Sequence, residues 1–295
     1  MSQIVVGVDG SPAATTAALW AAHEAAMRNV ELTVLHVVHP APEVWPQLAW
    51  PAVAVPPAVG EAQLAEGERV LEDSVEVIAK ASGSRQPRRI TTRLCVGAIV
   101  PTLAGLTEDK SQMVVVGRRG RGGLRRALLG SVSTAVVHAA QCPVAVVHNH
   151  VSPVQPSGAP IVVGVDGSAA SESAIAIAFD EASRRASDVV AVYSIDDADA
   201  PEAAEPLAQT LTDSQARYPD VTVRGLVARD HPADVLLDQS RQAQLVVVGS
   251  RGRGRFADEL LGSVSAAVIQ ACRVPVIVAP GPHRSVQRTH RRWIH

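Results

Sequence analysis

Two glycine-rich segments with matching spacing are the part of this sequence best suited to chemistry. They read "VVVGRRGRGGLRRALLGSVS" at 114–133 and "VVVGSRGRGRFADELLGSVS" at 246–265. Each begins with an apolar run and keeps the pattern G-x2-G-x9-G-S. Glycine loses more backbone freedom on folding than any other residue, so its repeated use at fixed steps predicts a site that needs bare main chain. Main-chain N–H groups gathered in such a loop bind anions.

The chemistry predicted for these loops is phosphate binding. We expect Gly117 and Gly120, with Gly122 and Gly123, to adopt positive φ angles and to turn main-chain N–H groups inward. Gly130 would let the chain pass close to the ligand. A purely structural tight turn is the alternative, and the repetition with identical spacing argues against it.

The end of each glycine pattern predicts a helix N-terminus. Ser131 is expected to cap the helix that begins there and to offer both its N–H and its hydroxyl. The partial positive charge at that end favours an anion by roughly 0.3–1 kcal/mol. The loop arginines have two possible roles, charge-assisted bonds to phosphate or plain solvation.

A second repeated segment, "VVGVDGS", occurs at 5–11 and at 162–168. Its aspartates, Asp9 and Asp166, carry a negative charge that suits ribose hydroxyls or an adenine donor and not phosphate. Capping of the next helix is the alternative role, but Ser11 and Ser168 already occupy the N-cap position. We therefore predict a carboxylate on one side of each site and a glycine loop on the other.

These repeated segments indicate an internal duplication. The opening segment recurs after 157 residues and the glycine pattern after 132, so the second copy is shorter by 25 residues between these landmarks. Most of the difference lies in a Pro- and Trp-containing stretch at 39–60. The Pro/Ser/Gly-rich stretch between the copies predicts a linker. We expect domains at 1–150 and 161–280, a linker at 151–160 and a basic tail at 281–295.

Apolar runs and helical segments alternate within each copy. In the first copy, strands are expected at 3–9, 31–38, 90–97, 113–117 and 143–148, and helices at 11–29, 61–81, 101–107 and 131–141. This alternation predicts α/β domains, each a doubly wound, Rossmann-like parallel sheet with helices on both faces. Ligands of such sheets bind beyond the carboxyl ends of the strands, where the connections diverge. The strand order 3-2-1-4-5 would bring the two repeated segments together, so we predict two tandem five-stranded domains of this order.

The composition excludes several classes of protein. The chain has 295 residues, of which 47% are hydrophobic and 19% charged, and its net charge is −2. These values fit a globular protein without a basic face for nucleic acid. We find no signal peptide and no run of about 18 apolar residues, so we expect a cytoplasmic protein that does not enter a membrane. The three cysteines and ten histidines form no spaced cluster, so neither disulfides nor a metal site is predicted.

The sequence resembles the universal stress protein family in its tandem two-domain form, over about residues 1–280. The segments "VVGVDGS", "VVVG-x-RG-x-G" and "LLGSVS", each present twice, carry the resemblance. In that family the glycine pattern marks members that bind ATP, so the resemblance implies ATP, with or without Mg²⁺, in each domain. It also implies nucleoside contacts from Asp9 and Asp166, and main-chain contacts to adenine near Val37 and Ser194. Ribose and phosphate contacts are implied for Gly117, Gly120, Gly130, Ser131, Gly249, Gly252, Gly262 and Ser263.

Further candidates lie beside these residues in the same segments. They are Gly7, Arg118, Arg121, Gly122, Gly123, Val132, Ser133, Gly164, Arg251, Arg253, Gly254, Arg255, Val264 and Ser265. One departure separates the copies at the end of the third strand, where Gly97 stands in the first copy and the charged pair Arg229-Asp230 in the second. This difference predicts a second pocket of different shape.

Two functions fit such sites. A nucleotide-binding regulator would act through its ATP-bound state, which presents a changed surface to a regulatory protein partner. A slow ATPase or phosphotransfer enzyme is the alternative, but the chain lacks G-x4-G-K-[ST], and its two lysines, Lys80 and Lys110, stand away from both glycine loops. A flavin or nicotinamide enzyme is disfavoured because the glycine loop follows the fourth strand and not the first.

Assembly is predicted from the last strand of each copy, "PVAVVH" and "PVIVAP". Both are apolar, and uncovered edge strands invite pairing. We expect the two domains of one chain to pair with each other. Because members of the family commonly dimerise through this strand, we also expect two chains to form a homodimer.

Overall fold

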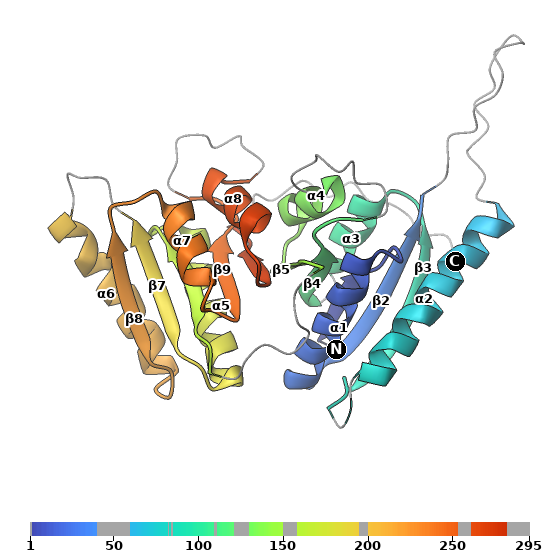
Figure 1. Cartoon of the computed structure of the whole chain (residues 1–295), viewed down its shortest axis with the longest axis horizontal. Helices are drawn as coiled ribbons and strands as arrows, with labels where there is room; N and C mark the ends of the chain where they lie inside the picture. The colour runs from blue at the N-terminus through green and yellow to red at the C-terminus, as the bar shows by residue number, and fades with distance from the viewer. Residues whose placement is uncertain are drawn as a thin grey trace, which may run out of the picture.

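Strands and helices alternate through the computed structural model of the chain (Figure 1). It describes residues 2–39, 60–81, 83, 85–108, 111–120, 130–149, 158–194, 200–252 and 261–281. Most of the stretch at 39–60, most of the linker and nearly all of the tail therefore lie outside the described residues.

The first half of the chain has the predicted order of elements. It contains β1 (Gln3–Gly7), α1 (Pro12–Met27), β2 (Glu31–Val38), α2 (Glu61–Ala81), β3 (Arg89–Val96), α3 (Ile99–Glu108), β4 (Ser111–Gly117), α4 (Ser131–Ala139) and β5 (Val144–Val147). Helix α2 has the bounds that the sequence predicted, whereas α3 begins two residues earlier than expected.

The second half repeats this order. It contains β6 (Ile161–Val165), α5 (Ala169–Arg185), β7 (Val189–Ser194), α6 (Ala200–Arg217), β8 (Val223–Ala228), α7 (Pro232–Ser240), β9 (Leu245–Gly249), α8 (Ser263–Ala271) and β10 (Val276–Ala279). Among the described residues, no helix combines the length and the apolar character that crossing a bilayer requires.

The strand order confirms the predicted topology. The strands form one sheet in the order β3-β2-β1-β4-β5-β10-β9-β6-β7-β8, which is 3-2-1-4-5 in each half. Pairing within each half is parallel. Helices α1, α2, α5 and α6 pack on one face, and α3, α4, α7 and α8 on the other. Because the sheet is covered on both faces, its central strands contain continuous apolar runs, "MVVV" in β4 and "LVVV" in β9.

The two halves join through their last strands. β5 and β10 pair in antiparallel fashion, with Val276 opposite Val146 and Val278 opposite Val144. On both faces of the sheet, the hydrophobic core runs across this junction without a break. The predicted pairing of the two domains of one chain is therefore confirmed.

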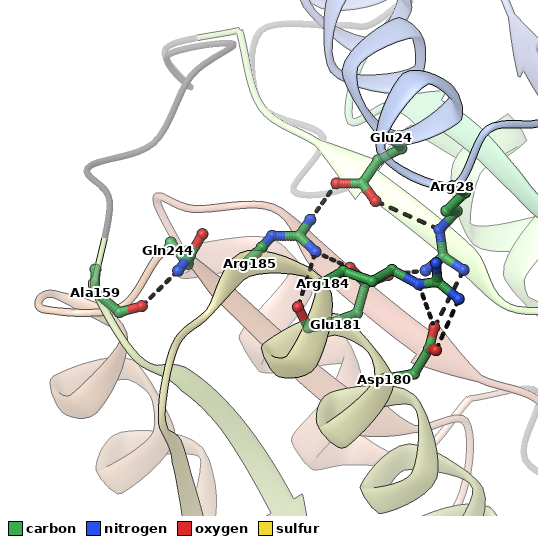
Figure 2. Close-up of polar contacts among 8 residues, drawn as sticks. All are labelled: Glu24, Arg28, Ala159, Asp180, Glu181, Arg184, Arg185 and Gln244. Atoms are coloured by element: carbon green, nitrogen blue, oxygen red, sulfur yellow. Dashed lines mark hydrogen bonds and ion pairs between the residues drawn. The ribbon is translucent and has the colours of Figure 1, made fainter. Parts of the chain in front are cut away.

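Buried charges also join the halves, between α1 and α5. Arg28 contacts Glu181, and Arg185 contacts Glu24, and both carboxylates are fully buried (Figure 2). The second glutamate and arginine each follow their counterparts by 157 positions, so the two ion pairs are equivalent under the duplication. Asp180 extends the cluster with a contact of 3.3 Å to Arg28 Nη1. Taking these charges out of water is costly, so the loss of one partner would leave an uncompensated buried charge at the junction.

We predict that Glu24→Gln destabilises the whole chain. The amide would leave Arg185 and Arg28 buried beside too little negative charge, at a cost of about 3 kcal/mol or more. Glu76→Gln is the control, because Glu76 pairs with Lys80 at 2.5 Å where both side chains are exposed. Urea unfolding should show a lower midpoint for the first variant only. Equal midpoints would contradict the role of the buried pairs.

A buried histidine lies at the same junction. His148 directly follows β5, and its Nε2–H donates to the carbonyl of Ile269 in α8 at 3.0 Å. Within the described part of the chain, its Nδ1 has no hydrogen-bond partner. Burial, followed by the nearby charge of Arg118, lowers the pKa of His148 from 6.5 to about 4. The ring is therefore neutral at pH 7.

This shift predicts a loss of stability in mild acid. Below pH 6.5 the unfolded chain protonates His148 while the folded chain does not, so stability is full above pH 6.5 and falls as the pH approaches 4. The loss reaches about 3 kcal/mol. His148→Gln keeps a side-chain N–H donor and removes the titration. Between pH 7 and pH 4, the free energy of unfolding of the parent chain should approach that of His148→Gln. Parallel pH profiles for the two proteins would contradict this account.

Candidate functional site

The two repeated segments meet at the carboxyl ends of β1 and β4, as predicted. These strands are neighbours in the sheet, with Gly7 opposite Val116. We call site 1 the set formed by residues 9–11, residues 117–120 and residues 130–133 at the start of α4. Site 2 is the equivalent set at residues 166–168, 249–252 and 262–265.

Serine hydroxyls tie the two sides of each site together. Ser11 is the N-cap of α1, where its Oγ accepts from the N–H of Ala14 at 3.2 Å. The same hydroxyl donates across the site to the carbonyl of Arg119 at 3.3 Å. In site 2, Ser168 caps α5 and donates to the carbonyl of Arg251 at 3.3 Å. The sequence predicted the caps but not the second contact, for which it carries no signal.

The glycines of site 1 are required by close approach and not by positive φ. At Gly117, a Cβ would lie 2.8 Å from the carbonyl carbon of Ala13 and 2.9 Å from its oxygen. At Gly120, a Cβ would collide with Oδ2 of Asp9. Neither residue is among the glycines with positive φ, so the predicted left-handed conformation is wrong for both. The side-chain-free main chain instead lets the loop lie against α1 and Asp9.

Positive φ occurs at the other side of each site. Gly10 has φ 75° and Gly167 has φ 73°, a conformation that favours glycine. Each follows an aspartate whose Oδ1 accepts from the N–H two residues on, at 3.0 Å for Asp9 and 2.9 Å for Asp166. This Asx turn fixes the carboxylate with Oδ2 toward the glycine loop. The Asp-Gly dipeptide was a signal for the turn that the sequence analysis did not use.

The helix N-termini differ from expectation in their caps. Gly130 is the N-cap of α4 and has no side-chain cap bond, and Ser131 is the first helical residue, so the predicted capping role of Ser131 is wrong. Ser133 is buried, and its hydroxyl lies 3.1 Å from the carbonyl of Arg118 and 3.0 Å from that of Gly130. A Cβ at Gly130 would stand 2.8 Å from the carbonyl oxygen of Arg118, so this glycine is needed by the loop itself.

Site 2 repeats this geometry. A Cβ at Gly249 would lie 3.0 Å from the carbonyl carbon of Ala170, and one at Gly252 would collide with Oδ2 of Asp166. Gly262 is the N-cap of α8, again without a side-chain cap bond, and Ser263 begins the helix. Ser265 donates to the carbonyl of Gly249 at 2.6 Å. The carboxylate, the bare loop and the uncapped helix thus recur together.

The remaining predicted residues occupy varied positions. Gly7 and Gly164 face Leu103 and Leu236 in the core. The side chains of Val132 and Val264 also pack against the core. Val37 lies near the end of β2 and is half-buried. Six predicted residues lie outside the described part of the chain: Arg121, Gly122, Gly123, Arg253, Gly254 and Arg255.

Two predicted residues make contacts that the sequence did not suggest. Ser194 donates its hydroxyl to the carbonyl of Asp230, a tie between β7 and the loop after β8. The first copy has Val37 at the equivalent place, and there Gly97 adopts φ 150°. Arg118 directs its guanidinium to the other half of the chain, where Nη1 donates to the carbonyl of Gln270 at 2.5 Å. Its predicted contact with phosphate stays a prediction.

Comparison with known proteins places this geometry in a family context. The model of the universal stress protein family matches residues 1–148 and again residues 159–280. The universal stress proteins Rv2005c and Rv2623 of Mycobacterium tuberculosis are each 44% identical over 289 residues, which covers 94% of this chain and 96% and 95% of theirs. A universal stress protein from Archaeoglobus fulgidus has a similar fold, with a TM-score of 0.69 at 20% identity over 95% of this chain and 96% of that one.

The geometry predicts different effects for two equal substitutions in site 1. Gly117→Ala would press a methyl group onto the backbone of α1, which cannot move freely, and should destabilise the fold by about 1–3 kcal/mol. Gly120→Ala would meet only the outer end of the Asp9 side chain, so it should leave the unfolding midpoint nearly unchanged. Thermal unfolding measures both. A larger loss for Gly120→Ala would contradict the assignment of Gly117 to packing.

Proposed function

The chain belongs to the universal stress protein family, and we propose that each of its two domains binds one ATP. The observation that carries this proposal is the close approach of a side-chain-free loop to a fixed aspartate, found in both sites. In each site the loop also contacts the start of the next helix, where the N–H of Gly130 or Gly262 donates to the carbonyl of Arg118 or Ser250.

The phosphates would bind at the starts of α4 and α8. The first N–H groups of a helix have no acceptor within it, and here neither Gly130 nor Gly262 supplies a side-chain oxygen. Helices α1 and α5 differ, because Ser11 and Ser168 cap them. The contrast supports α4 and α8 as anion sites, where the helix dipole adds to the orphan N–H groups.

The ribose would bind at the aspartates. Asp9 and Asp166 are each held by a main-chain N–H, with the second oxygen turned toward the glycine loop. A carboxylate accepts hydrogen bonds from hydroxyl groups and repels phosphate. This preference sets the direction of the nucleotide, with the sugar at the end of β1 or β6 and the phosphates at α4 or α8.

The choice of ATP among nucleotides rests on the family resemblance of the glycine pattern. Adenine would contact main chain near Val37 in site 1 and near Ser194 in site 2. Mg²⁺ bound with ATP is held largely by phosphate oxygens and water. Because Asp9 and Asp166 are assigned to ribose, we propose no protein ligand for the metal.

We propose that the chain acts through the bound state and not through turnover. Binding would change the surface offered to a regulatory protein in a stress response, in the cytoplasm. The units that bind would be residues 1–150 and 161–280, joined by residues 151–160. Two chains would form a homodimer, for which light scattering is the test. With β5 and β10 paired to each other, that contact would need another surface.

The aspartates provide the test. ATP released by denaturing the purified protein should be close to one per site, and it should be intact. Asp9→Ala and Asp166→Ala should each carry one ATP fewer per chain, and the double variant should carry no ATP. Asp238→Ala is the matched control, since Asp238 is an exposed residue of α7 that lies 3.8 Å from Arg241.

Two results would contradict the proposal. Full ATP content in the double variant, with its circular dichroism unchanged, would remove the aspartates from the sites. Empty protein that releases phosphate rapidly from added ATP would favour the enzyme instead.

A further inference from the structure

One helix connects site 2 to the other half of the chain. The N-terminal end of α8, at Gly262 and Ser263, belongs to site 2. Its C-terminal end lies at the junction of the two halves (Figure 1). With nine residues, the helix is about 13 Å long. One short element therefore belongs both to site 2 and to the junction.

The C-terminal end of α8 is capped by residues of the first half. The last carbonyl groups of a helix have no donor within it, and here the N–H of Cys272 reaches back to Val268. The next two carbonyls, of Ile269 and Gln270, accept from His148 Nε2 at 3.0 Å and from Arg118 Nη1 at 2.5 Å. A cation at this end also complements the helix dipole.

Arg118 is at the same time part of site 1. It directly follows Gly117, and its carbonyl accepts from the N–H of Gly130 at 3.1 Å. The hydroxyl of Ser133 lies 3.1 Å from the same carbonyl. The main chain of this residue therefore belongs to the loop of site 1, while its side chain holds the helix of site 2.

The residues at the positions of Arg118 and His148 differ in the second half. Ser250 occupies the place of Arg118, with the same main-chain bonds to Ala279 and Gly262 at 2.8 and 3.0 Å. A serine side chain is too short to reach α4 as the arginine reaches α8. His148 corresponds to Pro280, which has no side-chain donor. The contact of Arg118 with α8 therefore has no counterpart at Ser250, although the main-chain bonds of the two residues match.

We propose that Arg118 couples the two nucleotide sites through α8, so that a nucleotide in one site raises the affinity of the other. The proposal rests on the proposed function, because it needs both sites to bind. A ligand in site 1 that holds the main chain of Arg118 also holds the position from which its guanidinium reaches Gln270. Site 2 then binds to a helix that is already fixed, and the second ligand bears less of the ordering cost. By linkage, the effect is equal in both directions.

Calorimetric titration of ATP into nucleotide-free protein tests the coupling. Asp9→Ala and Asp166→Ala leave one working site each and report the two separate affinities. In the parent chain, the overall association constant for two ATP molecules should exceed the product of the two single-site association constants by about fivefold. In the Arg118→Ser background, which installs the residue found at position 250, the same comparison should give no excess.

A neighbouring cation serves as the control. Arg273 is exposed and lies just beyond α8, so Arg273→Ser removes a positive charge from the same helix end without touching the contact with the first half. The fivefold excess should persist in this variant. Circular dichroism and the unfolding midpoint verify that each variant is folded.

Three outcomes would overturn the coupling. The first is an overall association constant of the parent chain that equals the product of the single-site constants. The second is a fivefold excess that persists after Arg118→Ser. The third is a second ATP that binds more weakly than its single-site affinity. If Arg118→Ser only weakens site 1, Arg118 is a phosphate ligand and not a coupling residue. In all these cases ATP binds, whereas a failure of the proposed function would show no binding in any variant.

Discussion

The close approach of bare main chain to a carboxylate is the constraint on which both candidate sites depend. Gly120 and Gly252 have no side chain, so the loops after β4 and β9 lie against Asp9 and Asp166 without displacing the carboxylates. That contact requires β1 beside β4 and β6 beside β9, which is the strand order of the sheet. The strand order places the aspartate turn and the glycine loop of each site next to each other. The contacts of Ser11 and Ser168 with the loop carbonyls hold the two segments together.

Much of this could be predicted from the sequence because the signals are local or repeated. Apolar runs marked the strands, and the serine before Pro12 marked the start of α1. The reasons for the glycines were predicted wrongly, because spacing shows where a side chain is missing but not what fills its place. Gly117 faces Ala13, which is more than a hundred positions away in sequence, and the sequence of the glycine loop does not predict that contact.

The junction shows the same limit more sharply. The edge strands could be expected to pair because both are short and apolar, but the ion pairs of Glu24 with Arg185 and of Arg28 with Glu181 could not. These pairs, which are equivalent under the duplication, form because α1 and α5 lie side by side at the junction (Figure 2), an arrangement that the sequence does not show. The contacts of Arg118 and His148 break that symmetry, since the second half has serine and proline there. The chain therefore combines two similar sites with a contact between the halves, from Arg118, that Ser250 cannot make.

The most direct test is a crystal structure of the protein grown with a non-hydrolysable ATP analogue. The account predicts density in both halves, with the phosphates at the starts of α4 and α8 and the ribose hydroxyls on Asp9 and Asp166. A ligand with its sugar at the helix termini, or sites without ligand at millimolar analogue, would contradict it.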